Sequence, residues 1–577
     1  MDSGVEKDGW LLSGNEAVAQ GAYEAGLKFA SAYPGTPSSE ILEYLAQFDE
    51  VDCQWSVNEK VAYEVALSAA IGGIRSLYAS KHVGVNVAAD PLMTSAYVGV
   101  NAGFVAVSCD DPNMHSSQNE QDNRFYALMA KIPLIEPSSP GEAKEFIKKA
   151  FIISERFDTP VLFRMTTRIS HSKEVVKFNT RRDVGPREFK IDIKKYVMVP
   201  RNAYLRHIIL EERLQRLEKF SNRTSLNKIE WGKKSLGIIA SGVTYLYAKE
   251  MYPDASFLKL GFSFPLPAEK IKFFSSKVRA LFVIEELEPF LEMQIKSLGI
   301  KIKAKHRSFR IGELRPEYIP EIIKGKSKKE ISEKARKPLM CPGCPHRPVF
   351  WVLKKLKATV AGDIGCYTLG ASSPLSTLHS CLCMGSGVTF QEGFRHALKD
   401  GKIVGVIGDS TFIHSGITGL INSAYNKVKG VIIILDNRTT AMTGLQDHPG
   451  TGRTLKGDRT NHLDLEKLCL ACGADTVDVI DPYEVKELEN ILRKRLAEDS
   501  LSVIITRREC ILLSKHRNNP PKYLKENCNR CGMCLMIDCP ALTQDEEGYI
   551  VLNENLCTGC NLCVEVCKFQ ALIKNAG

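Results

Sequence analysis

Eight cysteines lie within the last 50 residues of the chain, in two runs with nearly the same short spacing. The first run has the pattern Cys-x2-Cys-x2-Cys-x4-Cys and comprises Cys528, Cys531, Cys534 and Cys539. The second has the pattern Cys-x2-Cys-x2-Cys-x3-Cys and comprises Cys557, Cys560, Cys563 and Cys567. Gaps of two residues allow three thiolates of one turning loop to reach three irons of a cubane cluster.

The fourth cysteine of each run decides how the ligands are shared. In two-cluster ferredoxins the fourth cysteine of one run binds the other cluster. We therefore predict one 4Fe–4S cluster on Cys528, Cys531, Cys534 and Cys567. The second is predicted on Cys557, Cys560, Cys563 and Cys539. Zinc sites are the alternative for grouped thiolates, but they favour separated CxxC pairs over CxxCxxC runs.

Two short apolar segments in the second half of the chain end in polar residues that could bind a metal ion. Residues 403–407 and 431–435 are predicted parallel strands, and Asp409 and Asn437 follow them. Because parallel sheets bind ligands at the carboxyl ends of their strands, these side chains are expected to meet. A carboxylate and an amide oxygen suit octahedral Mg2+, which also takes diphosphate oxygens. Gly408 would let the backbone approach a phosphate. The alternative to a metal and diphosphate site is an ordinary turn that contains Asp and Asn.

The residues around these two positions resemble a known family. Gly408-Asp409-Ser410, followed 25 residues later by Asp436-Asn437, is similar to the thiamine diphosphate motif in its GDS form. Thr440 to Gly444 and His448 to Gly450 extend the likeness to the alpha (large) subunits of the indolepyruvate ferredoxin oxidoreductase family, which are 2-oxoacid:ferredoxin oxidoreductases. The resemblance implies that Asp409, Asn437 and the carbonyl of Thr439 bind Mg2+, and that Gly408 and Ser410 contact the cofactor.

Further cysteines open and close this part of the chain. Related 2-oxoacid oxidoreductases hold a cluster near the thiamine on four cysteines, which implies a tentative third cluster on Cys341, Cys344, Cys366 and Cys510. Four soft thiolates suit such a cluster chemically. The alternatives are buried, redox-silent thiols or a small zinc site. Four other cysteines are predicted to be core residues, since free cysteine is often buried: Cys381, Cys383, Cys469 and Cys472.

The first 190 residues offer two candidate catalytic side chains. Thiamine needs a carboxylate beside N1′ of its pyrimidine ring, and Glu59 with Ala62 resembles the activating glutamate of the family. The alternatives are that Glu59 is a surface charge or that Glu64 takes its role. The turn from Tyr33 to Pro37 is similar to a turn whose threonine contacts the substrate carboxylate, which implies this role for Thr36. A purely structural turn is the alternative.

Composition limits the kind of protein that could carry these sites. The chain has 577 residues, 44% hydrophobic and 25% charged, as in soluble globular proteins, and its length suggests three or four domains. The longest apolar runs are far below the roughly 20 residues of a membrane span, and no signal peptide is recognised. The net charge of +10 is dispersed, which argues against nucleic-acid binding. A cytoplasmic protein is expected, whose 18 cysteines are thiols or ligands and not disulfides.

Helical and strand-like segments alternate along most of the chain, beginning with a predicted helix over residues 15–30. The fold class is therefore α/β, and the resemblance implies a multi-domain thiamine-diphosphate-binding fold of parallel sheets flanked by helices, with a C-terminal two-cluster ferredoxin-like domain. The predicted segments are a pyrimidine-binding domain (1–190), a linker or insertion (191–233), a transketolase-C-like domain (234–325), a diphosphate-binding domain (335–515) and the ferredoxin-like domain (520–577).

The resemblance implies an enzyme that oxidatively decarboxylates arylpyruvates with coenzyme A, giving an aryl-acyl-CoA and CO2. Its cofactors would be thiamine diphosphate, Mg2+ and two or three 4Fe–4S clusters. Its partners would be a smaller beta subunit and ferredoxin. Pyruvate and 2-oxoglutarate are alternative substrates. A non-oxidative thiamine enzyme conflicts with the cysteine-rich tail, and a non-catalytic electron-transfer subunit conflicts with the presence of Glu59, Asp409 and Asn437.

Overall fold

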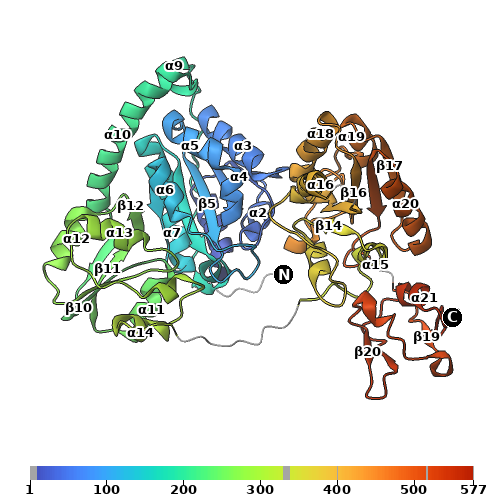
Figure 1. Cartoon of the computed structure of the whole chain (residues 1–577). Helices are drawn as coiled ribbons and strands as arrows, with labels where there is room; N and C mark the ends of the chain where they lie inside the picture. The colour runs from blue at the N-terminus through green and yellow to red at the C-terminus, as the bar shows by residue number, and fades with distance from the viewer. Residues whose placement is uncertain (1–8, 329–337, 399–400, 515–516, 576–577) are drawn as a thin grey trace, which may run out of the picture. The chain divides into compact units, whose positions relative to one another are not determined.

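The computed structural model of the chain describes residues 9–328, 338–398, 401–514 and 517–575 (Figure 1). It divides into two compact units, residues 1–332 and 333–577, and each is described by itself. The predicted domain limits at residues 1, 335, 515 and 577 lie outside the described residues, and the division into five segments stays a prediction. Within the described ranges, no helix combines the length and apolar character needed to cross a membrane.

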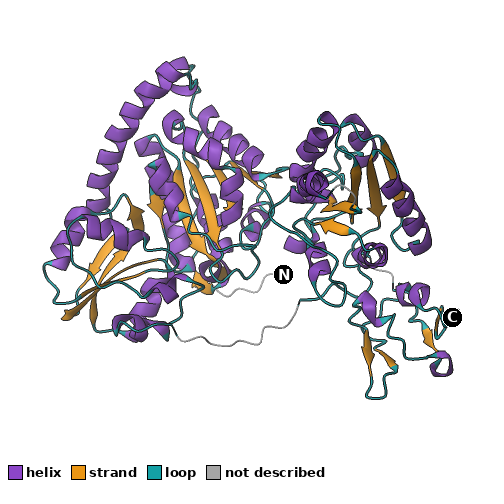
Figure 2. Ribbon diagram, in the orientation of Figure 1, coloured by secondary structure: helices purple, strands orange, loops and turns teal. Residues whose placement is uncertain are grey.

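Unit 1 is built on a seven-stranded sheet in the order β12-β6-β7-β5-β4-β2-β3, parallel throughout except where β12 meets β6. The strands are β2 (Phe29–Ala32), β3 (Asp52–Trp55), β4 (Ser76–Lys81), β5 (Phe104–Asp110), β6 (Leu134–Ile135), β7 (Val161–Thr166) and β12 (Phe262–Phe264). Helices cover the sheet (Figure 2), among them α1 (Gly14–Glu24), α3 (Glu59–Gly72) and α7 (Pro140–Phe157). Central strands such as β5 are buried along their whole length, as parallel strands covered by helices must be.

Helix α1 is shorter than its apolar spacing predicts. The predicted helix runs from residue 15 to residue 30, but α1 ends at Glu24 and β2 begins at Phe29. Gly26 lies between them with a φ of +80°. This left-handed conformation is accessible to glycine without strain and is typical of a helix end. The prediction was wrong because apolar periodicity alone does not register a break of one residue.

Residues 191–233, predicted to be a linker or insertion, contain regular structure. They form α9 (Ile193–Tyr196), the long helix α10 (Pro200–Arg223) and β9 (Asn227–Glu230). Arg213 of α10 is buried and donates a hydrogen bond to the carbonyl of Ala96 in α5 (Ala89–Val98). Strand β9 completes a second sheet in the order β13-β10-β11-β9, whose other strands are β10 (Lys233–Ser241), β11 (Ala255–Leu260) and β13 (Leu281–Ile284).

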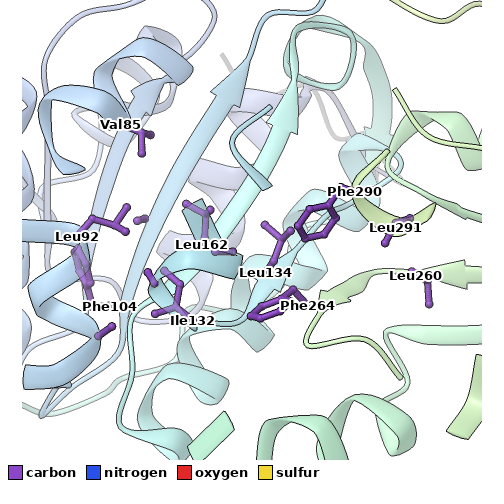
Figure 3. Close-up of a cluster of buried hydrophobic side chains, with 14 of the residues drawn as sticks. Val85, Leu92, Phe104, Ile132, Leu134, Leu162, Leu260, Phe264, Phe290 and Leu291 are labelled. Atoms are coloured by element: carbon purple, nitrogen blue, oxygen red, sulfur yellow. The ribbon is translucent and has the colours of Figure 1, made fainter. Parts of the chain in front are cut away.

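The two sheets of unit 1 share one apolar core. Strand β12 follows directly after β11 but pairs with β6 of the larger sheet, with Phe264 opposite Leu134. Figure 3 shows these two side chains in one cluster with Leu162 of β7 and with Phe290 of α13 (Phe290–Ser297). Because this core spans both sheets, residues 234–325 are packed against the first sheet.

A buried ion-pair network crosses the same junction. The guanidinium of Arg124 donates to Asp122 at 2.8 Å and to Glu285, which follows β13, at 2.7 Å. All three side chains are 1% exposed. Removing one member of a buried ion pair leaves an uncompensated charge in a medium that solvates it poorly.

We therefore expect Arg124→Met to lower the free energy of unfolding of unit 1 by about 3–5 kcal/mol. Urea denaturation of the full chain, followed by circular dichroism, would measure this change. The matched control is Lys60→Met, which removes a cation from an exposed pair with Glu64 and should change stability by less than about 1 kcal/mol. Equal effects of the two substitutions would contradict the expectation.

Unit 2 contains a five-stranded, fully parallel sheet in the order β14-β15-β16-β18-β17. The strands are β14 (Thr359–Ala361), β15 (Ile403–Gly408), β16 (Gly430–Asp436), β17 (Thr476–Ile480) and β18 (Leu501–Arg507). Helices α15 (His346–Leu356), α16 (Ser386–Ala397), α18 (Ile417–Tyr425) and α20 (Val485–Ala497) pack around it. The predicted strands at residues 403–407 and 431–435 correspond to β15 and β16.

The cysteine-rich tail adds only short elements to unit 2. They are the pairs β19 (Lys522–Tyr523) with β22 (Leu572–Ile573) and β20 (Leu542–Gln544) with β21 (Ile550–Leu552), and helix α21 (Leu562–Val566). Its buried Ile537 and Leu562 belong to the same apolar cluster as Val349 and Leu353 of α15. The tail is therefore packed against the parallel sheet domain through a continuous core.

Candidate functional site

Three polar side chains follow consecutive strands at the carboxyl edge of the unit 2 sheet. Asp363 follows β14, Asp409 follows β15 and Asn437 follows β16. The exposed fractions of the three side chains are between 0% and 7%. Because β14, β15 and β16 are adjacent and parallel, their polar ends line one crevice, which is where open α/β sheets bind ligands.

The loop after β16 closes onto Asp409. One carboxylate oxygen accepts a hydrogen bond from the backbone N–H of Ser410 at 2.8 Å, and the other accepts from that of Arg438 at 2.9 Å. This second bond brings Asp409 beside Asn437 and Thr439, both of which are buried. A carboxylate, an amide oxygen and a backbone carbonyl from these three residues have the chemistry of a Mg2+–diphosphate site.

Burial alone would raise the pKa of Asp409, but His448 and the N–H donors outweigh it and hold the pKa below its ordinary value. The Nε2 atom of His448 lies 3.3 Å from the Asp409 carboxylate, and its Nδ1 atom accepts from the N–H of Gly450. Asp409 is therefore held as an anion, which is the form that binds a cation. Burial and the Asp409 charge raise the pKa of the neighbouring Asp436.

Gly408 leaves room for the buried side chain of Tyr367. Its φ is −78°, which any residue adopts. A Cβ atom there would lie 2.8 Å from the Cε1 atom of Tyr367, a buried side chain. Glycine is therefore required at this position for the packing of Tyr367. Ser410, in turn, accepts a hydrogen bond from the hydroxyl of Thr440 at 2.9 Å.

Two buried groups beside Asp409 carry no local sequence signal. Burial lowers the pKa of His346 to about 4, although the nearby Asp409 charge opposes this. Burial raises the pKa of Asp363 to about 7, although its carboxylate accepts backbone N–H bonds, including one from Gly387 at 2.6 Å. A carboxyl group and an imidazole that are both driven toward their neutral forms are typical of functional sites.

Glu59 lies at the carboxyl edge of the unit 1 sheet, where it begins α3 after β3. It is 5% exposed, and a Cβ atom at Gly84 would lie 2.7 Å from its Oε1 atom. The carboxylate is thus packed against the backbone of α4 (His82–Val87), where only glycine leaves room. The alternative residue, Glu64, lies on the same helix with its side chain 45% exposed and pairs with Lys60. Burial therefore favours Glu59 for a role in an enclosed site.

Thr36 lies in the turn between β2 and α2 (Ser39–Leu45), at the same edge of the sheet as Glu59. Its carbonyl accepts a hydrogen bond from the hydroxyl of Ser116 at 3.1 Å. Two serines bond within this turn, since Ser38 donates to the Gly35 carbonyl and Ser39 accepts from the Gly35 N–H. The turn is rigidly braced, which suits a group that positions a ligand.

Two cavities in the tail are each lined by one of the predicted sets of four cysteines. The first is lined by Cys528, Cys531, Cys534 and Cys567. The second is lined by Cys539, Cys557, Cys560 and Cys563. Each set combines three cysteines of one run with the last cysteine of the other.

In the described part of the chain, no group of three or more His, Cys, Asp or Glu side chains is arranged to hold a single metal ion. Thiolates that bind different irons of a cubane lie further apart than ligands of one ion. In each cavity three cysteines of one run meet the last cysteine of the other run, which is the ligand sharing of two-cluster ferredoxins and favours clusters over the zinc alternative.

The four cysteines of the tentative third cluster lie in one neighbourhood. Burial raises the pKa of Cys366 to about 11, and the nearby Cys510 and Cys341 add to the increase. Burial raises the pKa of Cys344 to about 12, with contributions from Cys366 and Cys341. These mutual effects require that Cys510, which is far from the other three thiols in sequence, comes close to them in the fold.

Two cysteines predicted to be core residues are exposed. Cys381 and Cys383 lie in the loop before α16, where no helix covers them, and the Cys381 thiol donates to the Asp363 carbonyl at 3.5 Å. Cys469 is buried and Cys472 is half-buried. The prediction of burial was wrong for Cys381 and Cys383, because cysteine is buried only on average and these two residues lie in an exposed loop.

Three family models match the chain. Residues 20–215 match the thiamine diphosphate-binding domain of pyruvate flavodoxin/ferredoxin oxidoreductases. Residues 363–506 match the C-terminal binding domain of thiamine pyrophosphate enzymes, and residues 550–573 match a 4Fe–4S binding domain. Together with the buried Asp409 crevice and the cysteine-lined cavities, they define a thiamine-diphosphate-dependent 2-oxoacid oxidoreductase with iron–sulfur clusters.

Comparison with curated proteins narrows the class to one family. Indolepyruvate oxidoreductase subunit IorA of Archaeoglobus fulgidus is 39% identical over 97% of this chain and 97% of its own length. The corresponding subunit of Methanothermobacter marburgensis is 38% identical over 99% and 98%, and that of Thermococcus kodakarensis 39% over 97% and 96%. The chain belongs to the indolepyruvate oxidoreductase subunit IorA family. Among solved structures, a 2-oxoglutarate:ferredoxin oxidoreductase from Magnetococcus marinus is 17% identical, with a TM-score of 0.47 over 56% of this chain and 66% of its own.

Proposed function

We propose that this enzyme oxidatively decarboxylates arylpyruvates such as indolepyruvate with coenzyme A, releasing an aryl-acyl-CoA and CO2 and passing electrons to ferredoxin. The observation that carries the proposal is full-length similarity to proteins named indolepyruvate oxidoreductase subunits. Proteins named 2-oxoglutarate synthase subunit KorA are more distant: that of Archaeoglobus fulgidus is 25% identical over 55% of this chain. This difference favours an arylpyruvate over 2-oxoglutarate.

Each candidate site residue of this chain would have a different role in the reaction. Asp409, Asn437 and the Thr439 carbonyl would hold Mg2+ and, through it, the diphosphate. Thiamine diphosphate, when bound, supplies the carbon nucleophile and the electron sink for decarboxylation. Glu59 would hold a proton at N1′ of the pyrimidine, and its burial keeps that proton away from bulk water. Thr36 would hold the carboxylate of the 2-oxoacid.

Electrons would leave the site through thiolate-bound clusters. The cavity lined by Cys539, Cys557, Cys560 and Cys563 is also lined by Cys344 of the third group. A cluster on the third group would therefore be next to this tail cluster, and the cluster on Cys528 and its partners would be the exit toward ferredoxin. This chain would work with the smaller beta subunit, since its relatives are named as subunits.

The third cluster is tested by its iron. We expect Cys510→Ser to lower the iron content by about four atoms per chain, because each cubane holds four irons. Iron analysis of anaerobically purified enzyme would measure this loss. The control Cys472→Ser, on a half-buried thiol in a different part of the sheet domain, should retain all of the iron. An unchanged iron content in Cys510→Ser would remove the third cluster from the proposal.

The substrate is tested with the complete enzyme. The chain would be produced anaerobically together with the smaller subunit and assayed with indolepyruvate, phenylpyruvate, pyruvate and 2-oxoglutarate, each with coenzyme A and a viologen dye as electron acceptor. We expect the highest kcat/KM with the two aromatic acids. Activity confined to pyruvate or 2-oxoglutarate would refute the arylpyruvate assignment while leaving the enzyme class intact.

A further inference from the structure

A buried arginine joins the sheet domain of unit 2 to the cysteine-rich tail. Arg347, in the first turn of α15, is 1% exposed. Its guanidinium donates to the carbonyl of Cys341 at 3.2 Å and to that of Ile537, 190 residues away, at 2.8 Å. It also contacts the carbonyls of Met340 and Asp538. Its hydrogen bonds therefore connect the loop of the third cysteine group to the loop that carries Cys539.

All of these partners are neutral carbonyl groups. Among the described residues, no carboxylate forms an ion pair with Arg347. Arg124 illustrates the contrast, because its equally buried guanidinium meets both Asp122 and Glu285. A buried cation without a counter-charge is strongly disfavoured in a protein interior. A negative charge near Arg347 is therefore needed in the assembled enzyme.

Cysteines could supply this charge, since the described lining of the cavity beside Arg347 contains thiols and no carboxylate. Arg347 lines the same cavity as Cys539, Cys557, Cys560 and Cys563. Its guanidinium bonds the carbonyls of Ile537 and Asp538, the two residues that precede Cys539 in the chain. A 4Fe–4S cluster held by four thiolates is an anion, and its negative charge increases on reduction.

We propose that Arg347 is the counter-charge of the cluster on Cys539, Cys557, Cys560 and Cys563, and that it raises the reduction potential of this cluster. The inference rests on the proposed function, because it requires a cluster on these cysteines. A fixed cation stabilises the reduced cluster more than the oxidised one, since the reduced cluster carries the larger negative charge. Arg347 is thus a positioning residue: it acts through this cluster, by favouring the reduced form that holds the electrons entering the tail.

The test compares charge-removing and charge-keeping substitutions in the full chain with its smaller subunit. Arg347→Gln keeps hydrogen-bond donors without the charge, and Arg347→Lys keeps the charge. Redox titration of the anaerobic enzyme, followed by electron paramagnetic resonance, would report the potential of each cluster. For Arg347→Gln we expect about a tenfold lower ratio of reduced to oxidised cluster at fixed poise, or about 59 mV for one electron. Arg347→Lys should remain close to the wild-type potential.

The control is Arg213→Gln, which removes another buried guanidinium from α10 in unit 1 and should leave every cluster potential unchanged. An unchanged potential in Arg347→Gln, with the cluster present, would overturn the proposal. Arg347 would then have only a structural role, in which its hydrogen bonds hold the two loops together. Loss of iron from both Arg347 variants would also overturn the proposal and indicate the structural role. If the wild-type enzyme itself shows no cluster signal assignable to these cysteines, the proposed function fails and not the role of Arg347 alone.

Discussion

Replacing Glu59 with glutamine is expected to lower turnover by about 10^2–10^4-fold, the range associated with loss of a general acid–base group. Glutamine has nearly the same shape, so the packing of this side chain against Gly84 should persist. It has no exchangeable carboxyl proton, however, and would leave N1′ of the pyrimidine without its partner. Steady-state assay with a viologen dye, combined with iron analysis and circular dichroism, would separate lost catalysis from lost structure.

The matched control for this substitution lies on the same helix. Glu64→Gln alters an exposed carboxylate five residues further along α3, in a pair with Lys60 that contributes little to stability. We expect turnover to stay within about twofold of the wild-type value. Full turnover of Glu59→Gln, or a large loss of turnover in Glu64→Gln alone, would show that Glu59 is not the activating residue.

Replacing Asp409 with asparagine is expected to abolish Mg2+-dependent binding of thiamine diphosphate. Groups that only orient metal ligands contribute about 10–100-fold to affinity, so loss of a ligating carboxylate should exceed about 100-fold. Asparagine keeps one oxygen acceptor, for either the Ser410 or the Arg438 N–H group, and removes the negative charge. Calorimetric titration of the apoenzyme with thiamine diphosphate, at several Mg2+ concentrations, would measure the effect.

Asp499→Asn provides the comparison, because Asp499 is an exposed carboxylate in the same unit and lies in the turn before β18. Its affinity for thiamine diphosphate should equal that of the wild-type enzyme. The iron of the two tail clusters should be unchanged in both variants, since neither residue lines the tail cavities. Wild-type affinity in Asp409→Asn would mean that the carboxyl edge of β15 is not the diphosphate site.

Features governed by short stretches of chain could be predicted well. The cysteine spacing in the tail is local, and so is the alternation of buried strands and helices that places Asp409 and Asn437 after β15 and β16. Local patterns failed where a single backbone conformation decided the outcome, as at Gly26, which ends α1 early. The charged segment 191–233 contains a long helix and a strand that completes a sheet, and the pairing of that strand depends on residues far along the chain.

The sequence by itself determined the chemical inventory: eight cysteines with cluster spacing, a carboxylate and an amide at two strand ends, and a family resemblance that selected Glu59. Only the tertiary structure decided which of these groups are buried and what surrounds them. It separated buried Glu59 from exposed Glu64, packed Tyr367 against Gly408, and placed Arg347 in a cavity whose described lining has thiols and no carboxylate. The physical reason is that solvation and charge pairing depend on neighbours in space, which can be 190 residues away along the chain.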